Sequence, residues 1–214
     1  EGQAFDKENV VLVQGGGRRS IGTATHELTH ILVARASKGS FLGVPLWLNE
    51  GLAEYGNLDP GTSYERFLEW AIDTERLIPF SSLNRFPGEP NLTIVAYGQS
   101  RSFVSFIIKE FGSGSIQEIL NQLSEGKRID GALEVVLGSD LNELENKWRD
   151  YIGAKRVEIT DLEIRPKQGG SVPELKPYSL TPQPEDSSET LKEENKLEED
   201  QITNQSTGCN GTGS

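Results

Sequence analysis

The chain has 214 residues, a formal net charge of −12 and only 35% hydrophobic residues, which allows one domain of ordinary size and an appendage without a packed core. The acidic balance argues against attraction to nucleic acid or to an anionic membrane, so we expect no nucleic-acid partner. The one cysteine, Cys209, excludes a disulfide within the chain and a cysteine-based metal site. We also expect no membrane segment, because no stretch is long and apolar enough to span a bilayer.

The first predicted element is a β-strand at residues 9–14 (NVVLVQ), because three β-branched valines and a leucine occur there without a helical period. No other clear strand precedes the first helix. That helix is expected over residues 21–36, with Ser20 as its N-cap and with Lys38 and Gly39 just past its end.

Helical spacing dominates the rest of the folded region. After a loop that contains Pro45, the pattern predicts helices at residues 48–56, 64–76, 93–111, 115–124, 129–137 and 140–152. Two of these helices are expected in the core. One is the strongly apolar helix around Phe103, and the other is the last helix, around Trp148.

The C-terminal part has a different composition. Residues 157–164 alternate apolar and polar side chains and form either a closing strand or the start of a linker. From Arg165 the chain is rich in Pro, Glu, Ser, Thr and Lys, so it cannot bury enough apolar surface to offset its ordering entropy. We therefore expect a folded domain over residues 1–156 and a disordered acidic tail over residues 157–214. The tail is either an inert linker or a spacer to an anchor.

The chain does not begin with methionine. We therefore expect a processed protein or an excised piece. The folded part lacks cysteine, which is compatible with an extracytoplasmic or cell-envelope location, and that is the location we favour.

The most informative residues are the only two histidines, His26 and His30, in the sequence HELTH. Residues i and i+4 share one face of a helix, so both imidazoles can bind one metal ion, with Glu27 between them as a general base. The alternative is a surface helix that carries two histidines by chance. The apolar residues of this helix gather on the opposite side, where we expect it to pack against the core: Ile21, Ala24, Leu28, Ile31 and Leu32.

A catalytic zinc site usually has three protein ligands and one open position. The strongest candidate for the third ligand is Glu50, in WLNEGLAEY on the following helix. Glu54 lies one turn later on the same face and can accept the second ring N–H of a ligating histidine. The alternative reading of both residues is a solvated glutamate pair on an amphipathic helix.

HELTH followed by WLNEGLAEY resembles the gluzincin metallopeptidases, and the WLNEG motif is similar to that of the zinc aminopeptidases. Together with AYGQS at residues 96–100 and the helix around Trp148, the chain is most similar to the small bacterial peptidase MA-like domains, over about residues 9–152. The resemblance implies an α+β, predominantly helical, thermolysin-like zincin domain with a minimal N-terminal β portion. It also implies one Zn²⁺ per chain and a peptide or protein substrate.

The resemblance assigns roles to individual residues. His26, His30 and Glu50 would be zinc ligands, and Glu27 the general base. Tyr97 would hydrogen-bond the developing oxyanion. The alternative for Tyr97 is an ordinary core tyrosine at the start of a helix.

Two departures from the aminopeptidases matter. The stretch between the second histidine and Glu50 holds 19 residues, 31–49, one more than is usual there. No segment similar to GxMEN, which binds the free amino terminus of the substrate, precedes the helix. We therefore expect endopeptidase rather than aminopeptidase activity, with the strand at residues 10–13 pairing with an extended substrate. The alternative function is a non-catalytic, metal-stabilised scaffold or binding module of the cell envelope, although such a module has no need of Glu27.

Overall fold

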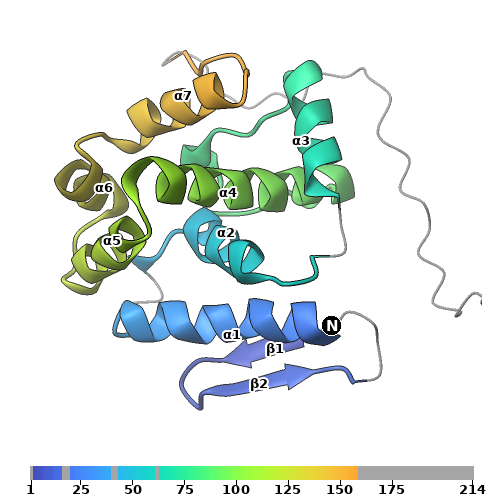
Figure 1. Ribbon diagram of the computed structural model, residues 1–214, viewed down its shortest axis with the longest axis vertical. Helices are drawn as coiled ribbons and strands as arrows, with labels where there is room; N and C mark the ends of the chain where they lie inside the picture. The colour runs from blue at the N-terminus through green and yellow to red at the C-terminus, as the bar shows by residue number, and fades with distance from the viewer. Residues whose placement is uncertain (1, 16–19, 40–42, 61–62, 159–214) are drawn as a thin grey trace, which may run out of the picture. The chain divides into compact units, whose positions relative to one another are not determined.

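The computed structural model describes residues 2–15, 20–39, 43–60 and 63–158, which form a predominantly helical fold with a small β portion, as predicted. The elements in chain order are β1 (Gly2–Phe5), β2 (Val10–Val13), α1 (Ser20–Ala36), α2 (Leu46–Gly56), α3 (Tyr64–Asp73), the 3₁₀ helix η2 (Phe80–Ser82), α4 (Pro90–Phe111), α5 (Gly114–Ser124), α6 (Ile129–Leu137) and α7 (Leu141–Tyr151) (Figure 1). All the predicted helices are present, with small shifts at their ends. The predicted acidic tail lies outside the described residues, apart from residues 157 and 158, which have no regular structure.

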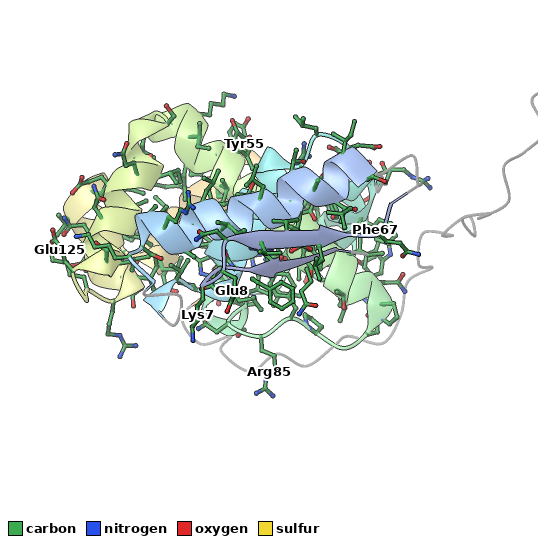
Figure 2. All side chains as sticks on the ribbon, turned by 90° about the horizontal axis from the view of Figure 1, so that it is seen from below. Lys7, Glu8, Tyr55, Phe67, Arg85 and Glu125 are labelled. Atoms are coloured by element: carbon green, nitrogen blue, oxygen red, sulfur yellow. The ribbon has the colours of Figure 1, made fainter. Side chains whose placement is uncertain are left out.

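The two strands form an antiparallel hairpin, in which Gly2 lies opposite Val13 and Phe5 opposite Val10. The hairpin lies against α1 (Figure 1), and Figure 2 shows Lys7 and Glu8 at its turn. The expectation of a single strand was therefore wrong. The sequence of β1, GQAF, is short and contains one large apolar residue, so it shows no recognisable alternation.

The predicted packing side of α1 was also wrong. Ile21, Leu28 and Leu32 are 66%, 49% and 53% exposed, and of the five predicted residues only Ile31 is fully buried. The physical reason is that α1 packs through its other sides. Its histidine face contacts α2, and a neighbouring side packs against the hairpin. Periodicity identified an apolar stripe but not the partners of the helix.

Helix α2 lies between α1 and α4 (Figure 1), and it touches α4 backbone to backbone. A Cβ atom added at Gly51 would lie 2.6 Å from the carbonyl oxygen of Ser100. Only glycine permits this approach, because real Cβ atoms do not come so close to a backbone oxygen. The position of α2 is therefore set by the main chain of α4.

Four buried aromatic rings join α2 to the C-terminal helices: Trp47, Phe80, Phe103 and Trp148. Phe80 and Phe103 stack with their ring centroids 4.1 Å apart, and the indole N–H of Trp148 donates to the hydroxyl of Ser102. The core positions predicted around Phe103 and Trp148 are thus confirmed. This cluster holds α2 and α4 in the arrangement that the site described next requires.

Two helix starts illustrate the capping rules. The Glu89 side chain accepts the backbone N–H groups of Asn91 and Leu92, and proline follows it, so α4 begins a little before the predicted helix. The Asp140 carboxylate accepts the N–H of Glu143 at the start of α7.

None of the described helices combines the length and the hydropathy that a membrane span requires.

Candidate metal centre

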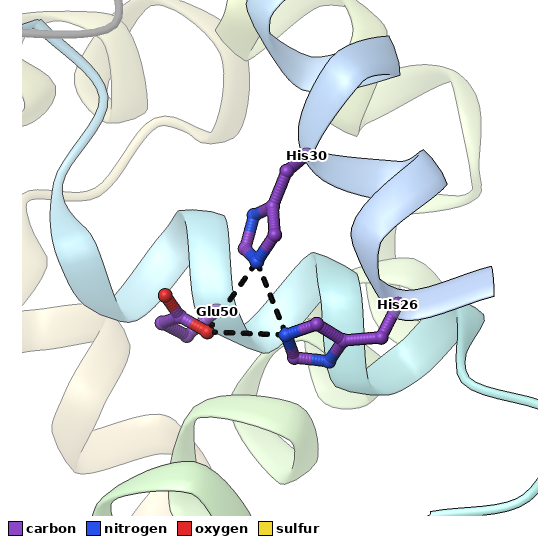
Figure 3. Close-up of side chains that lie close together, drawn as sticks. All are labelled: His26, His30 and Glu50. Atoms are coloured by element: carbon purple, nitrogen blue, oxygen red, sulfur yellow. Dashed lines mark hydrogen bonds and ion pairs between the residues drawn. The ribbon is translucent and has the colours of Figure 1, made fainter. Parts of the chain in front are cut away.

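Three side-chain atoms converge between α1 and α2 (Figure 3). His26 Nε2 and His30 Nε2 lie 3.1 Å apart, and Glu50 Oε2 lies 3.6 Å from the first and 3.7 Å from the second. These residues form the cluster of possible metal ligands found among the described residues. The structure therefore brings together the three residues that the sequence predicted as ligands.

The dimensions of this triangle fit a metal ion. Ligand atoms about 2.1 Å from a tetrahedral zinc ion lie roughly 3.4 Å from one another, and the three distances, 3.1, 3.6 and 3.7 Å, lie on either side of that value. Both Nδ1 atoms have acceptors of their own, so each Nε2 can present a lone pair to the same point. Two such nitrogens and a carboxylate oxygen at this spacing repel one another unless a proton or a metal ion lies between them.

Glu54 orients His26. Its Oε1 lies 3.0 Å from His26 Nδ1, and its Oε2 accepts the amide of Asn57 at 3.2 Å. The Tyr64 hydroxyl also hydrogen-bonds to Glu54. The Glu54 side chain is buried, so these contacts hold it in place, as a partner of a metal-binding histidine must be held.

His30 is oriented in a similar way by Asn49, whose Oδ1 lies 3.1 Å from His30 Nδ1. Asn49 is buried and directly precedes Glu50 on α2. One helix thus supplies the carboxylate of the cluster and an acceptor for each histidine. The sequence analysis missed Asn49, although its place beside the expected ligand was a usable signal.

The charges of the cluster act on His26. Burial lowers the pKa of His26, but hydrogen bonds and charge interactions with Glu50 and Glu54 outweigh burial and raise that pKa from 6.5 to about 9. The site therefore favours a positive charge between these carboxylates, whether a proton or a metal ion carries it.

Glu27 lies on the side of α1 that faces the hairpin. A Cβ atom added at Gly2 would come within 2.8 Å of Glu27 Cγ and 2.9 Å of its Oε1, so the backbone of β1 runs directly beside this carboxylate. The carboxylate has no hydrogen bond or ion pair within the part of the chain that the structure describes. It is thus available to exchange protons with a bound molecule.

Tyr97 is half-buried on α4, with its ring against Phe86 at a centroid distance of 4.9 Å. Burial and the negative charges of Glu50, Glu54 and Glu27 raise the pKa of Tyr97 to about 12. The phenol therefore lies within the electrostatic influence of these carboxylates and remains a neutral hydrogen-bond donor at ordinary pH. It lies within α4 and not at the helix start, because the helix begins earlier than predicted.

Tyr64 could not have been found from sequence. It lies on α3, ten residues beyond Glu54, and only the packing of α3 brings its hydroxyl to that carboxylate. Burial, followed by the charge of Glu54 and its hydrogen bond, raises the pKa of Tyr64 well above its usual value.

Comparison with known proteins gives one match. The family described as the peptidase MA superfamily matches residues 2–154. No curated protein and no solved structure shows significant similarity to the chain.

Proposed function

The chain belongs to the peptidase MA superfamily, and from this premise we propose that it is a zinc-dependent endopeptidase. The observation that carries the proposal is the triangle formed by His26, His30 and Glu50, whose dimensions suit one zinc ion. Membership of the superfamily supports peptidase activity in general. The metal, the kind of peptide bond and the residue roles below are our proposals.

His26, His30 and Glu50 would hold the zinc ion, and Glu54 and Asn49 would keep the two imidazoles in the correct tautomer and orientation. Nitrogen and oxygen donors of this kind suit zinc among the common metals. When bound, zinc supplies Lewis-acid polarisation of the scissile carbonyl and lowers the pKa of a water molecule.

Glu27 acts as the general base in this proposal. It takes a proton from the attacking water and delivers it to the leaving amine. Its freedom from other partners among the described residues supports the role. Tyr97, a neutral donor whose pKa is raised by the same carboxylates, gives a hydrogen bond to the oxyanion that develops on the carbonyl.

We place the substrate along β1 and not along residues 10–13, because Gly2 of β1 lies against Glu27. Within the described residues, β1 pairs only with β2, so its other edge can pair with an extended peptide backbone. An extended peptide bound in this way suits cleavage within a chain. We further propose that residues 1–156 form the peptidase domain and that the acidic residues after them serve as a linker.

The test measures metal content by elemental analysis and cleavage of an unbiased peptide library by mass spectrometry. We expect one zinc per chain and internal cleavage of peptides with blocked amino termini. Cleavage restricted to peptides with free amino termini would point to an aminopeptidase. Zinc at one per chain without any cleavage would instead support a metal-stabilised binding module.

A further inference from the structure

Tyr64 is the first residue of α3, and its side chain is buried against α4. A Cβ atom added at Gly98 of α4 would lie 3.2 Å from Tyr64 Cβ and 3.4 Å from its Cδ1, which is tighter than most real contacts of a Cβ atom. The lack of a side chain at Gly98 therefore makes room for the tyrosine ring. From this position the Tyr64 hydroxyl donates a hydrogen bond to the Glu54 carboxylate.

The Glu54 carboxylate connects this tyrosine to the metal cluster. It also contacts His26 Nδ1 and accepts the Asn57 amide, so three groups share the roughly four acceptor positions of one carboxylate. Asn57 directly follows the last residue of α2 and holds the carboxylate only relative to that helix. Among the described residues, Tyr64 is the partner of Glu54 that belongs to neither α1 nor the end of α2. Its hydroxyl therefore fixes Glu54, and through Glu54 the His26 ring, relative to α3 and α4.

The two imidazoles are held in different ways. His30 Nδ1 contacts Asn49, an amide that is buried on α2. Within the described part of the chain, the Asn49 side chain has no other hydrogen bond. The orientation of the His30 ring thus depends on α1 and α2 alone, whereas that of His26 also depends on α3.

Helix α3 is attached to the domain by a small apolar cluster that is distinct from the main core. In this cluster Phe67, Trp70 and Ala71 pack with Val95 of α4. The ion pair between Glu65 and Arg101 adds little, because the Glu65 side chain is 70% exposed. A helix held by so small a cluster opens more readily than the core, and a ligand that requires the helix in place stabilises it.

We propose that Tyr64 is a positioning residue of the metal centre, and that its hydrogen bond to Glu54 couples metal binding to the docking of α3. With the hydroxyl in place, Glu54 keeps the His26 ring turned so that Nε2 points towards the other two ligand atoms. Because coupling between two equilibria is reciprocal, an ion held by His26 also retains Tyr64 and α3. The inference rests on the proposed function, since it treats His26, His30 and Glu50 as a zinc site.

The first test measures zinc affinity by chelator competition in Tyr64→Phe, which keeps the ring and removes the hydroxyl. We expect an affinity about tenfold lower, at the lower end of the range for the outer partners of a metal-bound histidine. In a Glu54→Ala background the same substitution should cause no further loss, because both changes act through one chain of contacts. Tyr55→Phe is the matched control, since that side chain directly follows Glu54 and is exposed.

A second variant displaces the ring without removing the hydroxyl. Gly98→Ala brings a methyl group against Tyr64, and the ring must move by a few tenths of an ångström. We expect zinc affinity to fall in this variant as well. Gly131→Ala, which adds a methyl group in open space on α6, should leave zinc affinity unchanged.

The coupling itself is tested by hydrogen exchange of the backbone amides, with and without zinc. In the wild-type protein we expect zinc to slow exchange in α1, α2 and α3. In Tyr64→Phe we expect zinc to slow exchange in α1 and α2 but not in α3. A purely structural role of the hydroxyl would instead lower the protection of α3 equally with and without zinc.

Unchanged zinc affinity in Tyr64→Phe, or an equal loss in the Glu54→Ala background, would overturn the inference and leave the zinc site in place. None of these measurements uses cleavage, so zinc binding without peptidase activity would reject the proposed function and retain the inference.

If the wild-type protein binds no zinc, the proposed function fails, and the metal-free protein decides the role of Tyr64. The chain has only two histidines, so nuclear magnetic resonance can follow the Nδ1–H proton of each ring. We expect Tyr64→Phe to speed the solvent exchange of the His26 proton by about tenfold, as the loss of one hydrogen bond implies, and to leave that of His30 unchanged. Equal exchange of the His26 proton in the two proteins would overturn the inference.

Discussion

Glu54 Oε1 lies 3.0 Å from His26 Nδ1, so a buried carboxylate on α2 fixes the ring of a histidine on α1. We predict that Glu54→Ala lowers zinc affinity by about 10–100-fold, because His26 loses its orienting partner. Competition with a chromophoric chelator measures the change. Glu54→Gln keeps an acceptor oxygen and is expected to lose less, and the exposed residue Glu69 provides a control, Glu69→Ala. Unchanged affinity in Glu54→Ala would contradict the assignment.

Substitutions of Glu27 and of His26 are predicted to differ in their effects on zinc binding and on hydrolysis. Glu27→Gln should keep zinc but lower kcat by about 10²–10⁴-fold, because the general base is lost and the ligands are not. His26→Ala should lose both metal and hydrolysis. Elemental analysis and peptide cleavage, measured on the same preparations, check both results. Full activity in Glu27→Gln would remove Glu27 from the mechanism.

Tyr97→Phe is predicted to lower kcat by about 10²–10³-fold with little change in KM or in zinc content, because the hydroxyl acts only on the developing oxyanion. The ring and its contact with Phe86 are preserved in this variant. Steady-state kinetics with one peptide of the library provide the measurement. If Tyr97→Phe loses thermal stability and its loss of kcat follows from that loss, Tyr97 is a core tyrosine instead.

Zinc affinity is predicted to depend on pH. Since the pKa of His26 is raised to about 9 by Glu50 and Glu54, in spite of burial, this imidazole carries a proton at neutral pH that a metal ligand cannot keep. Affinity should therefore fall as pH falls below that pKa, by about tenfold per unit for one displaced proton. Calorimetric titration of the chelator-treated protein in two buffers of different ionisation enthalpy measures the proton released. No proton release near pH 7 would contradict the prediction.

Gly51→Ala is predicted to destabilise the domain by about 1–3 kcal/mol, because the added methyl group meets the carbonyl of Ser100 at 2.6 Å and must push α2 away from α4. Gly131→Ala is the matched control, since a Cβ atom there meets nothing within 4 Å and α6 gains about 0.5–1 kcal/mol from the replacement. Urea unfolding followed by tryptophan fluorescence compares the two. Equal stabilities would show that α2 and α4 are not in contact as described.

The sequence predicted the helices and the shared face of His26 and His30, because both depend on local spacing, whereas the place of Glu50 beside them was predicted from its distance after HELTH and from the resemblance to the gluzincins. Four residues separate the histidines, and this spacing specifies a shared helix face without reference to the rest of the chain. The contact of Glu54 with a histidine was predictable for the same reason. The WLNEGLAEY stretch places Glu50 and Glu54 one turn apart, so a helix that presents one presents the other.

The remaining features depend on packing between distant segments. The hydroxyl of Tyr64 reaches Glu54 only through the placement of α3, and β1 is recognisable only because β2 pairs with it. The exposure of Leu28 and Leu32 has the same origin. An apolar stripe on a helix indicates that a side can be buried, but the partners of α1 are specified elsewhere in the chain.

The outward stripe of α1 has a consequence for how this domain can change. Between Ser20 and His30, the helix turns its large aliphatic side chains to the surface and contacts α2 through its histidines and their acceptors, so polar contacts lie where other helix pairs have aliphatic ones. We therefore expect substitution of both histidines to weaken the packing of α1 on α2 as well as to remove the candidate metal ligands. We expect that a related domain without the two histidines would need aliphatic residues at these positions to keep α1 packed on α2.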